Sequence, residues 1–223
     1  MTRAERAAIH AALGDESRLA VVEALALTDA SSAALAGLLG LPTNLLAHHL
    51  AILEGVGLIE RRNSDGDGRL RYIRLKPDRL PGPLSVPVIE GDVVLFACSR
   101  NSAPSQLASV LFRRRTVRDA HSAGSKPAPA VHPRAHLAAE EVGLRLPTTT
   151  NGYDDVPTPD ILVTVCDLAK EEPPPFEATV RLHWSIPDPV ADGRMGAFRA
   201  ARDELEHRID LLARAMTHRE ENT

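Results

Sequence analysis

The sequence has few aromatic residues, few cysteines and no long hydrophobic run. Only 3% of its 223 residues are Phe, Trp or Tyr, so its cores must be built mainly from aliphatic side chains. Two cysteines do not make a disulfide framework, which fits a reducing cytoplasm. No stretch approaches the ~20 apolar residues of a membrane-spanning helix, and no signal-peptide core follows the charged start. We therefore expect a cytoplasmic protein without membrane contact.

A strong charge of one sign is also absent. The net charge is −4 at pH 7, with 43% hydrophobic and 25% charged residues. Nucleic-acid binding would therefore need a local basic patch, because no global positive field attracts a polyanion. A chain of this length can bury one large core or two small ones.

A proline-rich segment divides the sequence. It contains Pro77, Pro81, Pro83 and Pro87, which favour an extended, semi-rigid spacer. We place the first domain at residues 1–76, the linker at 77–90 and the second domain at 91–223.

Helix start and stop signals predict four helices in the first domain. Asp15 caps the second helix, Ser31 or Ser32 the third, and Thr43 or Asn44 the fourth. Two strands follow, at residues 58–62 and 69–75, and the Asp-Gly pairs between them are a strong hairpin signal.

This order of helices and hairpin is typical of an α+β winged helix-turn-helix domain. The segments ALGDESRL (12–19) and AHHLAIL (47–53) resemble the ArsR/SmtB-type repressors, and the resemblance covers roughly residues 5–76. It implies a homodimer that binds double-stranded operator DNA, with the helix that starts near Thr43 in the major groove.

One side of this helix and the hairpin provide the expected DNA contacts. Leu46, Leu50 and Leu53 share the core face, so the residues pointing away from it would meet DNA. These are Thr43, Asn44, Ala47, His48 and Ala51. On the hairpin, phosphates or the minor groove would be contacted by Arg61, Arg62, Arg69 and Arg71. Alternatively, these arginines only form an ordinary solvent-exposed surface and do not contact DNA.

The adjacent His48 and His49 raise the question of a metal site. Neighbouring residues on a helix point about 100° apart, so the two rings cannot readily share one ion. We expect His48 to face DNA and His49 to pack at the core margin. Metal-sensing members of the family carry cysteines near the third helix, and residues 28–33 contain none. We therefore expect no metal and no cofactor.

The second domain begins with a candidate anion site. The apolar run Val93–Ala97 predicts a buried strand, Cys98 ends it, and Pro104 opens a helix. Backbone N–H groups and the helix dipole would bind an anion between them, and they would lower the pKa of a thiol there. The expected ligand-binding residues are Cys98, Ser99, Arg100, Asn101, Ser102, Ala103, Ser105 and Gln106.

This loop resembles that of the low-molecular-weight tyrosine phosphatases and the arsenate reductases with the same fold. Residues 160–166 and 183–189 resemble two later segments of these enzymes. The resemblance implies catalytic roles for Cys98 as nucleophile, for Cys166 as a second thiol and for Asp188 as general acid. Alternatively, Cys166 is a buried structural cysteine and Asp188 only starts a turn.

The loop departs from the family at Pro104, which stands where these enzymes have their arginine. The proline removes the guanidinium that grips two oxygens of the anion, and it also removes its own N–H. Loss of a single oxyanion donor typically costs about 2.7–4 kcal/mol of transition-state stabilisation. Arg100 either replaces that donor or points into solvent, and we expect the latter. Residues 167–173 contain no third cysteine, so a thiol relay would be incomplete.

Strands expected at 92–97, 117–122, 161–165 and 180–184 alternate with helices, which predicts an α/β domain with a four-stranded parallel sheet and helices on both faces. We interpret the chain as a transcriptional regulator whose catalytically degenerate second domain senses a small anion, namely phosphate, arsenate or a phosphorylated metabolite. The alternative is a repressor fused to a working arsenate reductase or tyrosine phosphatase that uses Cys98. A third possibility is a second domain that only assists dimerisation.

Overall fold

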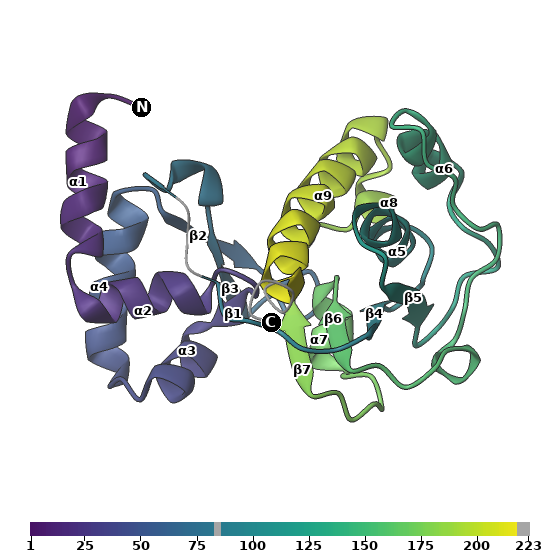
Figure 1. Cartoon of the computed structure of the whole chain (residues 1–223), viewed down its shortest axis with the longest axis horizontal. Coiled ribbons are helices and arrows are strands. Elements are labelled where there is room, and N and C mark those ends of the chain that lie inside the picture. Colours follow the sequence, from purple (N-terminus) through teal and green to yellow (C-terminus); the bar gives the residue numbers. More distant parts are fainter. Residues whose placement is uncertain (83–85, 218–223) are drawn as a thin grey trace, which may run out of the picture. The chain divides into compact units, whose positions relative to one another are not determined.

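The computed structural model describes residues 1–82 and 86–217 and divides into two compact units (Figure 1). The first unit comprises Met1–Ser64 and Gly68–Val86, and the second comprises Asp65–Asp67 and Pro87–Thr223. In the segment expected to be a linker, a short 3₁₀ helix spans Pro77–Arg79. Pro83, which belongs to the same expected linker, lies outside the described residues.

The first unit contains α1 (Arg3–Leu13), α2 (Glu16–Ala24), α3 (Ser32–Leu39) and α4 (Thr43–Gly55). Two of the expected caps are confirmed, because Asp15 accepts the Arg18 N–H at 3.0 Å and Ser31 accepts the Ala34 N–H at 3.2 Å. The expected cap of α4 is wrong. The N-cap is Pro42, without a side-chain bond, because its carbonyl already accepts the Leu46 N–H at 2.9 Å. Thr43 and Asn44 therefore lie inside the first helical turn.

The core of the first unit is aliphatic, as the scarcity of aromatic residues implies. Ile9 of α1, Val22 of α2, Leu35 of α3, and Leu46 and Leu50 of α4 are at most 1% exposed. Because each helix contributes to the same cluster, hydrophobic burial holds all four together.

A small antiparallel sheet completes the first unit. Strands β2 (Ile59–Asn63) and β3 (Arg71–Leu75) form the expected hairpin, and β1 (Ala30–Ser31) adds to its other side in the order β1-β3-β2. The sequence does not predict β1, because a strand of two residues has no detectable alternation.

The second unit has the expected four-stranded parallel sheet. Its strands are β4 (Val93–Cys98), β5 (Asp119–Gly124), β6 (Ile161–Thr164) and β7 (Val180–His183), in the order β5-β4-β6-β7. The helices are α5 (Pro104–Arg115), α6 (Pro133–Glu140), α7 (Asp167–Glu171), α8 (Pro189–Asp192) and α9 (Met195–Thr217). Helices α7 and α8 are single turns that the sequence does not distinguish from loops.

The two faces of this sheet are covered differently. On one face, Phe96 contacts the rings of Phe112 in α5 and of Trp184, and α5 packs against α9. On the other face, Leu95 and its neighbours pack against apolar residues that include Tyr153, at the start of a short 3₁₀ helix (Tyr153–Asp155), and Phe176. The sequence predicts helices on both faces; α5 and α9 cover the first face, whereas a short 3₁₀ helix and loop residues contribute the apolar contacts on the second.

The helices of residues 1–82 and 86–217 include none that is long and apolar enough to cross a membrane by itself. One bent pair, α3 with α4, reaches the necessary length and composition together, and nothing beyond length and composition favours a span there.

Candidate anion-binding site

The candidate site is the loop between β4 and α5, at the carboxyl edge of the parallel sheet. Cys98 is the last residue of β4, and Pro104 is the first residue of α5. Asn101 has a φ of 48°, in the left-handed region, which asparagine tolerates better than most residues. Parallel strands, a tight loop and a helix N-terminus thus come together as the sequence indicates.

The buried Asn101 side chain connects the loop to its surroundings. Its Nδ2 donates to Ser105 Oγ at 2.9 Å, and its Oδ1 accepts from Gln106 Nε2 and from the Asn151 N–H, each at 2.8 Å. Its backbone N–H donates to Cys98 Sγ at 3.0 Å. These bonds satisfy a side chain with no solvent exposure, and they fix the loop around the sulfur of Cys98.

The loop carbonyls are bonded to the segment that follows β5. Ser99 O accepts from the Lys126 N–H at 2.8 Å, Arg100 O from Ala128 at 2.9 Å and Ser102 O from His132 at 2.8 Å. The N–H groups of Arg100 and Asn101 point to the inside of the loop, since both donate to the sulfur of Cys98. Such an arrangement of N–H groups binds anions.

Gly124 allows this close approach. A Cβ atom there would lie 2.8 Å from Ser99 O and 2.9 Å from the Asn101 nitrogen, which real structures essentially never show. Gly124 also pairs with Gly152 in an isolated bridge. The end of β5 and the segment around Gly152 therefore support the loop from one side.

The structure brings Cys98 and Cys166 together, and both are free thiols. A hydrogen bond from Cys166 lowers the pKa of Cys98 from 9.0 to about 7, assisted by Ser105 and the Asn101 N–H, while burial opposes the change. The bond with Cys98 and burial raise the pKa of Cys166. Cys98 is thus the thiol that ionises first, at a pH near neutrality.

The remaining expected site residues differ in exposure. Arg100 is exposed, in agreement with an arginine that points into solvent, and Ser99 is partly exposed. The buried members of the loop are Ser102, Ala103, Ser105 and Gln106. Asp188 is the N-cap of α8, where its Oδ1 accepts the Val190 N–H at 2.9 Å. Its turn-forming role is therefore present in the structure.

Tyr153 is a neighbour of the two thiols that the sequence does not indicate. Among the described residues no group forms a hydrogen bond with its buried hydroxyl oxygen. Burial and the charge of Cys98 and Cys166 raise its pKa, so the phenol stays neutral. The only available signal was an aromatic residue within a loop of a chain that has few aromatics.

A buried polar chain anchors the segment after Cys166. His183 Nδ1 lies 2.9 Å from Thr164 Oγ1, and His183 Nε2 lies 3.3 Å from Asp167 Oδ1. Burial would raise the pKa of Asp167, but hydrogen bonds from His183 and Ser185 hold it below its usual value. Asp167 is therefore a carboxylate that fixes the start of α7.

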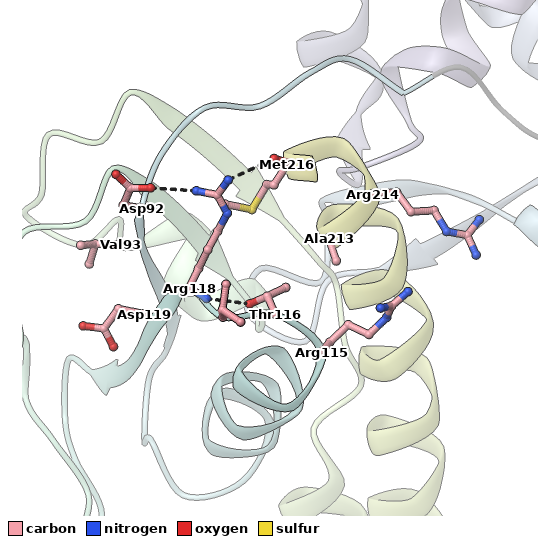
Figure 2. A pocket seen from close by; sticks show the side chains of 10 residues that line it. Asp92, Val93, Arg115, Thr116, Arg118, Asp119, Ala213, Arg214 and Met216 are labelled. Atoms are coloured by element: carbon pink, nitrogen blue, oxygen red, sulfur yellow. Dashed lines mark hydrogen bonds and ion pairs between the residues drawn. The ribbon is translucent and has the colours of Figure 1, made fainter. Parts of the chain in front are cut away.

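A large hollow of the second unit lies elsewhere. It has a volume of about 880 Å³ and is lined by the start of β4, the start of β5 and the last turns of α9, at the amino edge of the sheet (Figure 2). Arg118 there donates to Asp92 Oδ1 at 2.8 Å and to Met216 O at 3.1 Å. None of the residues of the candidate loop, Cys98–Gln106, lines this hollow.

Within residues 1–82 and 86–217, no group of three or more His, Cys, Asp or Glu side chains forms a metal site.

The contact between the thiols predicts the pH dependence of alkylation. In the wild type, the rate at which iodoacetamide modifies Cys98, measured by peptide mass spectrometry, should rise with a midpoint near pH 7, since the pKa is about 7. Cys166→Ala removes the main hydrogen-bond donor and should move the midpoint toward 9.0. Cys166→Ser keeps a donor and is the matched control, with a smaller shift. A midpoint unchanged by Cys166→Ala would contradict the assigned contact.

Known proteins match the second unit. Residues 93–222 match the family "Low molecular weight phosphotyrosine protein phosphatase". An arsenate reductase from Archaeoglobus fulgidus is 29% identical, with 54% of this chain and 98% of that chain covered and a TM-score of 0.48. An arsenate reductase in its oxidized state is 24% identical, with 56% and 98% covered and a TM-score of 0.50. A tyrosine phosphatase from Erwinia amylovora is 18% identical, with 57% and 95% covered and a TM-score of 0.50.

No curated protein matches the chain. The family match spans more than half of the sequence and includes the loop, both thiols and Asp188. Through residues 93–222, the chain belongs to the low molecular weight phosphotyrosine protein phosphatase family.

Proposed function

We propose that this protein is a DNA-binding transcriptional regulator of the ArsR type whose phosphatase-like domain binds a small oxyanion as its effector. The observation on which this rests is the loop itself. Its backbone N–H groups converge on Cys98, as an anion site requires, and Pro104 stands where the family resemblance places the catalytic arginine. Such a site retains binding and loses the main side-chain donor of catalysis.

The first unit supports the DNA-binding part of the proposal. Helices α3 and α4 followed by the β2–β3 hairpin have the order of a winged helix-turn-helix. Leu46, Leu50 and Leu53 of α4 are buried. The side chains on its opposite side are exposed, namely Thr43, Asn44, Ala47, His48 and Ala51. His49 is only 6% exposed and belongs to the core margin.

The hairpin supplies the cations that an acidic chain needs for DNA. The expected arginines are mostly exposed: Arg61, Arg69 and Arg71 are accessible and Arg62 is partly so. Arg74, by contrast, is buried and pairs with Asp29 at 3.7 Å, so it belongs to the fold. We further propose that the regulator acts in the cytoplasm as a homodimer on a near-palindromic operator, because two-fold proteins read two-fold sites.

The ligand that fits the loop is a tetrahedral oxyanion. Phosphate, arsenate and phosphorylated metabolites share three or more oxygens that can accept the loop N–H groups, and α5 contributes the positive end of its dipole. Because the guanidinium is missing and Arg100 is exposed, we expect binding without efficient turnover.

A second function is favoured by one observation. Cys98 has a pKa of about 7 and contacts Cys166, which are features of a working thiol site. The chain would then be a repressor fused to an arsenate reductase or phosphatase. The missing arginine and the absence of a third cysteine in residues 167–173 argue against it.

The wing arginines should contribute to DNA affinity. Arg69→Ala with Arg71→Ala should weaken binding to an operator fragment, selected from random DNA by the wild-type protein, by about tenfold or more at 0.15 M salt. The slope of log affinity against log salt should also fall by roughly 1–2, because each arginine that no longer neutralises a phosphate lowers it by about one unit. Fluorescence anisotropy measures both. Arg113→Ala with Arg134→Ala removes the same charge from the second unit and should have little effect. Equal affinity of the wing variant and this control would refute the wing assignment.

The anion should change DNA affinity through the loop. Titration of phosphate or arsenate should shift the anisotropy curve of the wild type, and operator DNA should shift the anion's affinity by the same factor. Ser102→Trp fills the loop and should abolish the shift, whereas Ser102→Ala should keep it. An undiminished response in Ser102→Trp, with circular dichroism like that of the wild type, would place the effector site elsewhere.

Turnover should be negligible because the loop lacks its arginine. Hydrolysis of para-nitrophenyl phosphate and thiol-dependent reduction of arsenate should not exceed the rates of Cys98→Ser. Pro104→Arg should raise Cys98-dependent hydrolysis by restoring a bidentate donor. Wild-type turnover of about 1–10³ per second would instead support the enzyme function.

A further inference from the structure

The two thiols of the second unit meet at the carboxyl edge of the parallel sheet. Strands β4 and β6 are neighbours, with Ala97 paired to Thr164. The Val165 N–H then donates to Ala97 O at 2.8 Å, so Cys98 and Cys166 follow next to each other at the end of this pairing. Their sulfur atoms share a hydrogen bond, and both thiols are free. Two adjacent thiols are a candidate ligand set for a soft metal ion.

Backbone N–H groups around the pair favour a negative charge on the sulfurs. The Asn101 N–H donates to Cys98 Sγ at 3.0 Å, and the Arg100 N–H donates to the same sulfur. At the other sulfur, the contact with Cys98 and burial raise the pKa of Cys166, and the Ser99 N–H acts in the opposite direction. Each sulfur therefore has a donor that stabilises its thiolate, which is the form of cysteine that binds metal.

The thiol pair offers two ligands and not four. In the described parts of the chain, no group of three or more His, Cys, Asp or Glu side chains could hold a metal ion. His183, on the neighbouring strand β7, already uses its two ring nitrogens for Thr164 and Asp167. Zinc in structural protein sites takes four ligands. Two thiolates alone suit a soft monovalent ion such as Cu(I), which accepts two sulfur ligands.

The charge of such a complex also fits its surroundings. Two thiolates carry two negative charges and Cu(I) one positive charge, so the complex is itself a small anion. N–H groups that converge on the sulfurs stabilise this charge. A divalent ion with the same two thiolates would be neutral and would gain less from these donors. Tyr153, whose phenol stays neutral beside the thiols, adds no opposing charge.

We propose that Cys98 and Cys166 together bind a soft monovalent metal ion, represented by Cu(I), between their sulfur atoms. The ion takes the place of the proton in the hydrogen bond between the two sulfurs. Each cysteine that is still protonated releases its S–H proton to solvent, two S–Cu bonds form, and no electron is transferred. This inference goes beyond the proposed anion sensing and does not depend on it, because the thiols are in contact whichever anion the loop binds.

Competition with bicinchoninate, a coloured chelator of Cu(I), measures the affinity of the full chain in oxygen-free buffer. Cys98→Ser and Cys166→Ser should each weaken binding by about 100-fold or more, because a single thiol loses the advantage of two linked ligands. Met195→Leu is the control: it removes another soft sulfur, keeps both thiols and should leave the affinity unchanged. Circular dichroism checks that each variant is folded. Equal affinity of the wild type and Cys166→Ser would overturn the proposal.

Two measurements on the wild type need no variant, so they decide the question even where a substitution unfolds the chain. X-ray absorption at the copper edge should show two sulfur ligands and no other. A nitrogen or oxygen ligand, or a third sulfur from a second copy, overturns the assignment. At pH 7, binding should release more than one proton per ion, since Cys166 is protonated and Cys98, with a pKa of about 7, is only partly ionised. Release of less than one proton would show that Cys166 does not bind the ion.

The outcomes distinguish this inference from the proposed function. If the wild type binds Cu(I) but neither phosphate nor arsenate, the thiol site stands and the proposed anion sensing fails. If it binds phosphate but does not compete with bicinchoninate for Cu(I), the thiol site alone is overturned. Zn(II) tests the number of ligands and should bind much more weakly than Cu(I). Comparable affinity for Zn(II) would require further ligands and would overturn a site of two thiols.

Discussion

The buried amide of Asn101 is the interaction on which the proposed anion site depends. A loop of five residues between β4 and α5 has no hydrophobic core of its own, so polar bonds must hold its shape. Asn101 bonds to Ser105, Gln106 and the backbone of Asn151, and its own N–H reaches Cys98 Sγ. In a buried environment such a satisfied network is rigid, because breaking any one bond leaves an unpaired polar group.

Rigidity of the backbone is the physical basis of the proposed separation between anion binding and catalysis. The carbonyls of Ser99, Arg100 and Ser102 are held by the segment after β5, so these bonds do not involve the side chain at position 104. Pro104 is also compatible with the first turn of α5, where its missing N–H disturbs no intrahelical bond. Under the proposed function, Pro104 therefore removes a catalytic side chain while the fold of the site persists.

Several features of the structure were predictable because they depend on neighbours in the sequence. The caps Asp15 and Ser31, the hairpin and the strands of the parallel sheet all follow from local residue patterns. The sequence-based predictions were wrong or missing where a local pattern was ambiguous or too short. Thr43 and Asn44 are both good caps, yet the N-cap of α4 is Pro42, and β1, α7 and α8 are too short to give a periodic signal.

By itself, the sequence determined the order of the longer elements, the aliphatic core of the first unit and the candidate anion loop with its proline. Only the tertiary structure decided which side chains surround that loop. Cys166 and Tyr153 are separated from Cys98 by tens of residues, and the pairing of β4 with β6 and of Gly124 with Gly152 brings them close. Local patterns carry no information about such contacts, because they form between segments that meet only when the sheet assembles.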